Sequence, residues 1–127
     1  MFSHVMLGAN DIEASKKFYD ATLAVLGYEP GIVMDNRCIY ANEKGIFIIT
    51  LPINGEPATH GNGSTLGFAI SSPELVDAWH KAGVENGGIT CEDPPGERNG
   101  PAGRLYLAYL RDPAGNKLCG THRLPKA

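Results

Sequence analysis

The spacing of apolar residues in the N-terminal half predicts one helix among four strands. Residues 3–9 (SHVMLGA) are mostly apolar and lead into Asn-Asp, a pair typical of a helix N-cap. Beyond this pair, one stripe of helical spacing carries Ala14, Phe18, Ala21 and Val25. Gly27 is the expected end of that helix. Three strand-like segments follow at residues 28–33, 37–41 and 45–51, which gives the order βαβββ.

The same order returns after residues 52–63 (PINGEPATHGNG), a linker rich in Pro, Gly and Asn. Residues 64–70 (STLGFAI) form a short apolar strand, and Ser-Ser-Pro-Glu then opens a helix with either Ser71 or Ser72 as its N-cap. Gly83 is its expected end. A long loop is expected at residues 92–103, and strands at residues 88–91, 105–111 and 117–122.

The two halves align on each other. An offset of 61 residues places His4 on Thr65 and Phe18 on Trp79, and in the last part an offset of 70 places the turn glycine Gly45 on Gly115. The sequence therefore predicts a single α+β domain over residues 1–127, built from modules at about 1–51 and 64–122. An α+β domain without internal duplication is the simpler alternative.

Composition narrows the possible partners. A chain of 127 residues allows one domain, and its net charge of −3 without a basic stripe argues against nucleic-acid binding. No apolar run has the roughly 20 residues of a membrane span. The three cysteines are widely spaced, with no secretory leader pattern before them. We therefore expect a soluble protein of the reducing cytoplasm.

Two loops carry candidate binding residues. His60 lies in the linker, and loops are where binding residues concentrate. The loop at residues 92–103 carries Arg98, which could hold a carboxylate or phosphate, and Tyr106 follows in the next strand. The alternative for this loop is a solvated surface on which arginine pairs with a neighbouring acid. No phosphate-binding glycine loop or serine nucleophile motif is present.

Three segments resemble the vicinal oxygen chelate superfamily, which includes glyoxalase I, extradiol dioxygenases and the bleomycin- and fosfomycin-resistance proteins. They are SHVMLGANDIEASKKFYDATLAVLGY, HGNGSTLGFAI and RDPAGNKLCG. The resemblance covers nearly the whole chain. It implies two βαβββ modules that form an open, cup-shaped mixed sheet with the helices outside, a small molecule bound in the cup, and a homodimer.

The resemblance also implies where a metal would be held. Metal-dependent members use four His and Glu ligands, one from the first and one from the last strand of each module. His4 matches the first position, Thr65 and Cys119 stand in place of a His and a Glu, and residues 46–51 (IFIITL) offer no ligand. The usual site is therefore expected to be largely lost. Cys119 is otherwise a small buried strand residue, and His4 a hydrogen-bonded polar residue at a strand start.

The resulting hypothesis is a homodimeric protein that binds a small molecule in the cup, with no certain cofactor. The expected ligand contacts are His4, His60, Thr65, Arg98, Tyr106 and Cys119. The alternative is a metal-dependent lyase or dioxygenase that holds Zn, Ni, Fe or Mn with non-standard ligands. His4 and Cys119, joined by His60 or His122, would supply those ligands.

Overall fold

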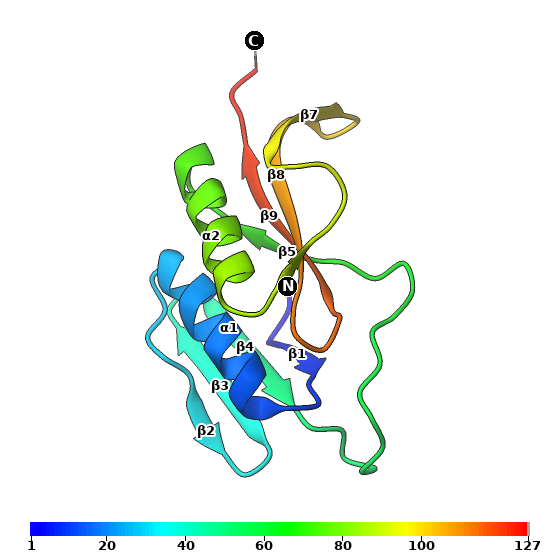
Figure 1. Ribbon diagram of the computed structural model, residues 1–127. Helices are drawn as coiled ribbons and strands as arrows, with labels where there is room; N and C mark the ends of the chain where they lie inside the picture. The colour runs from blue at the N-terminus through cyan, green and yellow to red at the C-terminus, as the bar shows by residue number, and fades with distance from the viewer. Residues whose placement is uncertain (127) are drawn as a thin grey trace.

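The computed structural model describes residues 1–126, which form two helices and nine strands in two separate sheets (Figure 1). The first half contains β1 (Val5–Gly8), α1 (Ile12–Val25), β2 (Ile32–Met34), β3 (Arg37–Asn42) and β4 (Gly45–Thr50). The second half contains β5 (Leu66–Ala69), α2 (Pro73–Glu85), β6 (Ile89–Thr90), β7 (Gly96–Gly100), β8 (Gly103–Arg111) and β9 (Lys117–Arg123).

Both sheets follow one plan. The four-stranded sheet has the order β1-β4-β3-β2, and the five-stranded sheet has the order β5-β9-β8-β6 with β7 paired to β8. In each half the first strand pairs in parallel with the last strand, and the other pairs are antiparallel. The predicted α+β architecture of two βαβββ modules is confirmed. Neither helix in the described part of the chain is long and apolar enough to cross a membrane.

Both helices begin where the sequence predicts. The Asp11 carboxylate accepts a hydrogen bond from the Ala14 amide at 3.1 Å. In α2 the Ser72 hydroxyl accepts from the Leu75 amide at 3.2 Å, with Pro73 as the first helical residue. Ser72 rather than Ser71 is thus the N-cap of α2, and proline suits the next position because that amide would have no helical partner.

Three expected boundaries were wrong. The loop expected at residues 92–103 contains β7, which forms a hairpin with β8 through the pairing of Gly100 with Gly103. The segment at residues 28–33 forms only the short β2, which begins at Ile32. Helix α2 continues through Gly83 to Glu85, and a Cβ atom at Gly83 would lie 2.4 Å from Leu110 Cδ1. Gly83 therefore serves close packing instead of ending the helix.

One hydrophobic core joins the two modules. The helices lie side by side on one side of the sheets (Figure 1), and the buried rings of Phe18 and Trp79 belong to the same cluster. The Phe68 ring of β5 lies 5.7 Å from Phe47 of β4 and 6.3 Å from Trp79, measured between ring centroids. Aromatic side chains from both sheets thus pack into a single unit with the helices.

The turn between β8 and β9 ties the second module to the first. Asp112 is 3% exposed, and its carboxylate accepts a 2.5 Å hydrogen bond from the Tyr19 hydroxyl of α1. The Asn116 side-chain amide donates to Asp112 at 2.9 Å and to the Gly8 carbonyl at 2.8 Å. Burial, together with the neighbouring Asp112 carboxylate, raises the pKa of the Tyr19 phenol well above its ordinary value. Tyr19 therefore stays protonated and acts as the donor.

A polar cluster around Asp20 fixes the segment that leads into β2. The Asp20 carboxylate accepts from Lys16 Nζ at 2.6 Å, from the Gly31 amide at 2.9 Å and from the Tyr40 hydroxyl at 2.8 Å. Partial burial acts to raise the pKa of this carboxyl, but the hydrogen bonds from Lys16, Gly31 and Tyr40 together outweigh it. The net result is a pKa below the ordinary value.

This lowered pKa predicts a stability contribution that acid removes. A carboxyl with a lowered folded-state pKa stabilises the fold above its unfolded pKa and loses that contribution as the pH falls through its folded pKa. We expect Asp20→Asn to be less stable than the unmodified protein at pH 7, and the difference to shrink as the pH falls below about 4. Urea unfolding over this pH range measures it. Asp93→Asn, at an exposed aspartate, is the control, and a difference independent of pH would contradict the prediction.

Candidate ligand site at the junction of the two modules

Alternate residues of the strands form an open face that points away from the helices. In β4 the buried side chains of Phe47 and Ile49 join the core. In β9 a Cβ atom at Gly120 would lie 2.8 Å from Trp79 on α2. Because neighbouring side chains of a strand point to opposite faces, Ile48 and Cys119 belong to the open face.

The strand registers identify equivalent positions in the two modules. The parallel pairs are Met6 with Ile48 in the first module and Gly67 with Cys119 in the second. His4 lies two residues before Met6, and Thr65 lies two residues before Gly67. The four equivalent positions on the open face are therefore occupied by His4, Ile48, Thr65 and Cys119.

A pocket of about 350 Å3, which we call the junction pocket, lies where β1 meets the linker and the beginnings of β5 and β9. Met6 supplies an apolar wall, while His60, Thr65, Asn116 and Lys117 supply polar groups. A site with a few polar groups beside apolar surface is typical of small-molecule binding.

His60 is held against the turn between β8 and β9. Gly115 has a φ of +93°, and a Cβ atom there would lie 2.8 Å from His60 Cδ2. Only glycine satisfies both the left-handed backbone and this close approach. The same turn that binds Tyr19 through Asp112 thus also supports the linker wall of the junction pocket.

Lys117 brings a partly neutralised cation to the pocket. Its ammonium group pairs with the Glu92 carboxylate and lies 5.1 Å from the centroid of the Tyr109 ring. Partial burial, reinforced by the nearby Cys119, raises the pKa of Tyr109. The Tyr109 side chain therefore stays neutral, and its distance from the ammonium group fits a cation–π contact.

A second hollow of about 490 Å3, which we call the open-face pocket, adjoins the junction pocket at Met6. Its lining includes Met34, Ile39 and Ile53, with Asp35 and Arg37 as the charged residues. Met6 is shared by the two pockets, so an apolar surface continues from the polar junction pocket over the first sheet.

The expected site residues are only partly brought together. His60 and Thr65 both line the junction pocket. His4 is exposed, and its Nδ1 lies 2.7 Å from the Ser3 hydroxyl. Cys119 is buried on the open face, with its Sγ 3.2 Å from the Thr121 hydroxyl.

Arg98 and Tyr106 lie elsewhere. Arg98, in β7, donates to the backbone carbonyls of Asp93 and Pro94 at 3.2 and 2.9 Å. Tyr106, in β8, packs toward α2 and donates to the Asp77 carboxylate at 2.9 Å. Its side chain is therefore on the helix side of the sheet, opposite Cys119.

The residues at the four equivalent positions do not form a donor set for a divalent metal. Ile48 has no donor atom, and the other three offer one imidazole, one hydroxyl and one thiol. His122 Nδ1 forms a 2.9 Å hydrogen bond with the Ile70 carbonyl oxygen on the helix side of the sheet, away from Cys119. Within residues 1–126 no group of three or more His, Cys, Asp or Glu side chains is placed to hold a metal ion.

Sequence reasoning missed Met6 and Lys117 as pocket residues. The signal was available, because strand alternation places Met6 on the face of His4, and Lys117 on the face of Cys119. Both residues stand in strands, at positions to which the resemblance gives no role.

Comparisons with known proteins agree with this architecture. The family model described as the glyoxalase/bleomycin resistance protein/dioxygenase superfamily matches residues 1–119. A crystal structure of a glyoxalase/bleomycin resistance protein from Albidiferax ferrireducens T118 is 65% identical, with a TM-score of 0.95 over 97% of this chain and 99% of that one. No curated protein matches this chain.

More distant structures share the fold alone. A glyoxalase-related enzyme from Fulvimarina pelagi is 20% identical, with a TM-score of 0.74 over 97% of this chain and 88% of that one. A family enzyme from Burkholderia phytofirmans PsJN is also 20% identical, with a TM-score of 0.73 over 96% of this chain and 98% of that one. The family match over residues 1–119 and the 65% identical relative show that this chain belongs to the glyoxalase/bleomycin resistance protein/dioxygenase superfamily.

Proposed function

We propose that this protein binds a small organic molecule in the junction pocket and that its own residues, without a resident metal, supply the contacts. The observation that carries the proposal is the convergence of His60, Thr65 and Lys117 on one hollow beside the apolar side chain of Met6. Two of these residues were expected as ligand contacts from the sequence.

The lining indicates the kind of ligand. The imidazole of His60, the hydroxyl of Thr65 and the ammonium group of Lys117 in the junction pocket suit a carbonyl, hydroxyl or carboxylate oxygen. The open-face pocket beyond Met6 suits an apolar body, because Met34 and Ile39 line it. We therefore propose an elongated ligand with one oxygen-bearing end and one apolar end.

The test is a ligand screen followed by a blocking variant. Small carbonyl compounds, aromatic acids and phenols are screened by thermal shift, with EDTA or with Zn, Ni, Fe or Mn, since ligand binding to the folded state raises apparent stability. A compound that raises the Tm in EDTA is expected. Met6→Trp would fill the junction pocket, and we expect this variant to bind that compound about tenfold or more weakly.

The matched control is Ile89→Trp in β6, because Ile89 is 68% exposed and lines neither pocket. It should leave binding unchanged. Equal binding by Met6→Trp and the unmodified protein would overturn the proposed site. Binding that requires added metal, with turnover, would overturn the metal-independent proposal in favour of a lyase or dioxygenase with non-standard ligands.

The homodimer and the cytoplasmic location remain part of the proposal. Support for the dimer comes from exposed apolar side chains around the open face, where Met6 is 37% and Ile46 43% exposed. Apolar surface of this kind marks association sites. Light scattering coupled to gel filtration determines the oligomeric state.

A further inference from the structure

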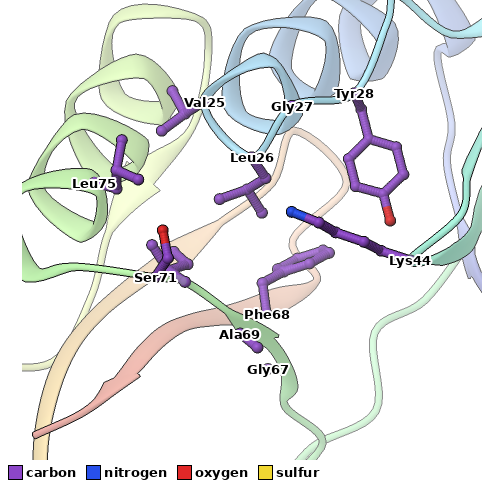
Figure 2. Close-up of a pocket in the computed structure, with 11 residues that line it drawn as sticks. Val25, Leu26, Gly27, Tyr28, Lys44, Gly67, Phe68, Ala69, Ser71 and Leu75 are labelled. Carbon is purple, nitrogen blue, oxygen red and sulfur yellow. The ribbon is translucent and has the colours of Figure 1, made fainter.

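A separate cavity of about 490 Å3, which we call the helix-end pocket, lies on the helix side of β5. Its walls come from the C-terminal end of α1 with Leu26, the first turn of α2 with Leu75, the Phe68 side chain of β5, and Lys44 from the turn between β3 and β4 (Figure 2). It shares no lining residue with the junction pocket or the open-face pocket. Its volume falls in the roughly 300–1,000 Å3 range of small-molecule sites.

Lys44 is directed into this pocket. Its backbone amide donates to the Asn42 side chain at 2.8 Å, which fixes the turn that carries it. Figure 2 shows the Lys44 side chain between Tyr28 and Phe68, with its nitrogen pointing toward Leu26. Three ion pairs occur in the part of the chain that the structure describes, and none includes Lys44. The ammonium group therefore reaches an apolar hollow without a carboxylate partner there.

The edge of β5 adds backbone groups to the same hollow. The Ile70 amide donates to the Thr121 carbonyl of β9 at 2.8 Å. Peptide groups of a parallel strand alternate in direction, so those of Gly67 and Ala69 point away from β9 to the free edge of the sheet. Both residues line the pocket, so a ligand held there can reach the backbone groups at this edge of the strand.

We propose that the helix-end pocket is a second ligand site, for a small carboxylic acid with an aromatic or branched aliphatic body. The Lys44 ammonium binds the carboxylate, and Leu26, Phe68 and Leu75 cover the apolar body. A small acid fits better than an added peptide strand, because β5 has only four residues and Lys44 is the single charged residue that lines the hollow.

The probes are 3-phenylpropionate and its uncharged amide, 3-phenylpropionamide, titrated into the 127-residue protein labelled with 15N. We expect the acid to shift the backbone amide signals of Leu26, Gly67 and Ala69, and the amide to bind about tenfold or more weakly. Lys44→Met keeps the aliphatic stem and removes the charge, so it should weaken acid binding to the level of the amide. Lys81→Met, at an exposed lysine of α2 outside the pocket, should bind the acid unchanged.

Several outcomes overturn the inference. These are equal binding of acid and amide, unchanged acid binding by Lys44→Met in a variant whose spectrum is otherwise folded, and no shift at saturating acid. Binding of a short extended peptide along β5 in preference to the acid would replace it with strand addition. Shifts confined to Thr65 and Lys117 would place the acid in the junction pocket, which overturns this inference and leaves the proposed function standing.

Discussion

Asp112→Ala is expected to lower the free energy of unfolding by about 3–4 kcal/mol, because it leaves several buried donors without an acceptor. Each unsatisfied buried donor costs about 1–3 kcal/mol. The carboxylate accepts from the Tyr19 hydroxyl and from the Asn116 backbone and side-chain amides, at distances of 2.5 to 2.9 Å. It also accepts from the Ala114 amide at 3.0 Å. No water reaches these groups easily, since Asp112 is 3% exposed.

Urea unfolding at pH 7 measures this loss. The control is Asp77→Ala, which removes a tyrosine–aspartate hydrogen bond at the surface, the 2.9 Å bond from Tyr106. Water replaces an exposed acceptor, so the control should change stability by less than about 1 kcal/mol. Similar effects of the two substitutions would show that the turn between β8 and β9 does not hold the modules together.

Trp79→Ala is expected to destabilise the protein by about 3–5 kcal/mol, the range for removing a large buried aromatic side chain. Trp79 is fully buried, and its ring centroid lies 6.3 Å from that of Phe68. Its ring also fills the space that a side chain at Gly120 would need. The lost volume lies between α2 and the strands β5 and β9.

Trp79→Phe separates ring packing from hydrogen bonding. The Trp79 Nε1 atom is buried and has no hydrogen-bond partner in the described structure. Phenylalanine removes this unsatisfied donor and keeps one aromatic ring, so we expect a loss clearly smaller than that of Trp79→Ala. Chemical denaturation of the three proteins gives the comparison, and a loss for Trp79→Phe as large as that for Trp79→Ala would contradict it.

The elements whose signals are local were predictable from the sequence. Asp11 and Ser72 cap helices through their own side chains, and the apolar stripes containing Phe18 and Trp79 face the core as their spacing predicts. Glycines were ambiguous. Gly27 and Gly83 both looked like helix ends, but Gly83 lies inside α2. Glycine is needed there because Leu110 occupies the space that a larger side chain would fill.

The hairpin of β7 and β8 was missed for another reason. Its strand GERNG lacks the alternation of apolar residues that marks a strand, because the hairpin projects away from the helices (Figure 1). Cross-strand pairing with β8 holds it instead, supported by the 2.7 Å ion pair of Arg104 with Glu97. A polar strand of this kind leaves no apolar pattern in the sequence, although its partner strand follows directly along the chain.

Only part of the candidate site followed from the sequence. His60 and Thr65 line the junction pocket, because the linker and the start of β5 meet beside β1. The face of the sheet on which the Tyr106 side chain lies depends on the register of β8. A shift of one residue would move this side chain to the opposite face. The sequence left open which residue of the segment 46–51 is equivalent to Cys119, and the strand register identifies it as Ile48 through its pairing with Met6.

The hydrogen bond from Tyr19 to Asp112 has a consequence for synthesis on the ribosome. Chains emerge from the N-terminus, and domains begin to fold as they are made. Tyr19 and the Gly8 carbonyl belong to the first module, but their partners lie at residues 112 and 116. The first half therefore emerges with a tyrosine hydroxyl that has no buried acceptor, so its native packing waits until nearly the whole chain has been translated.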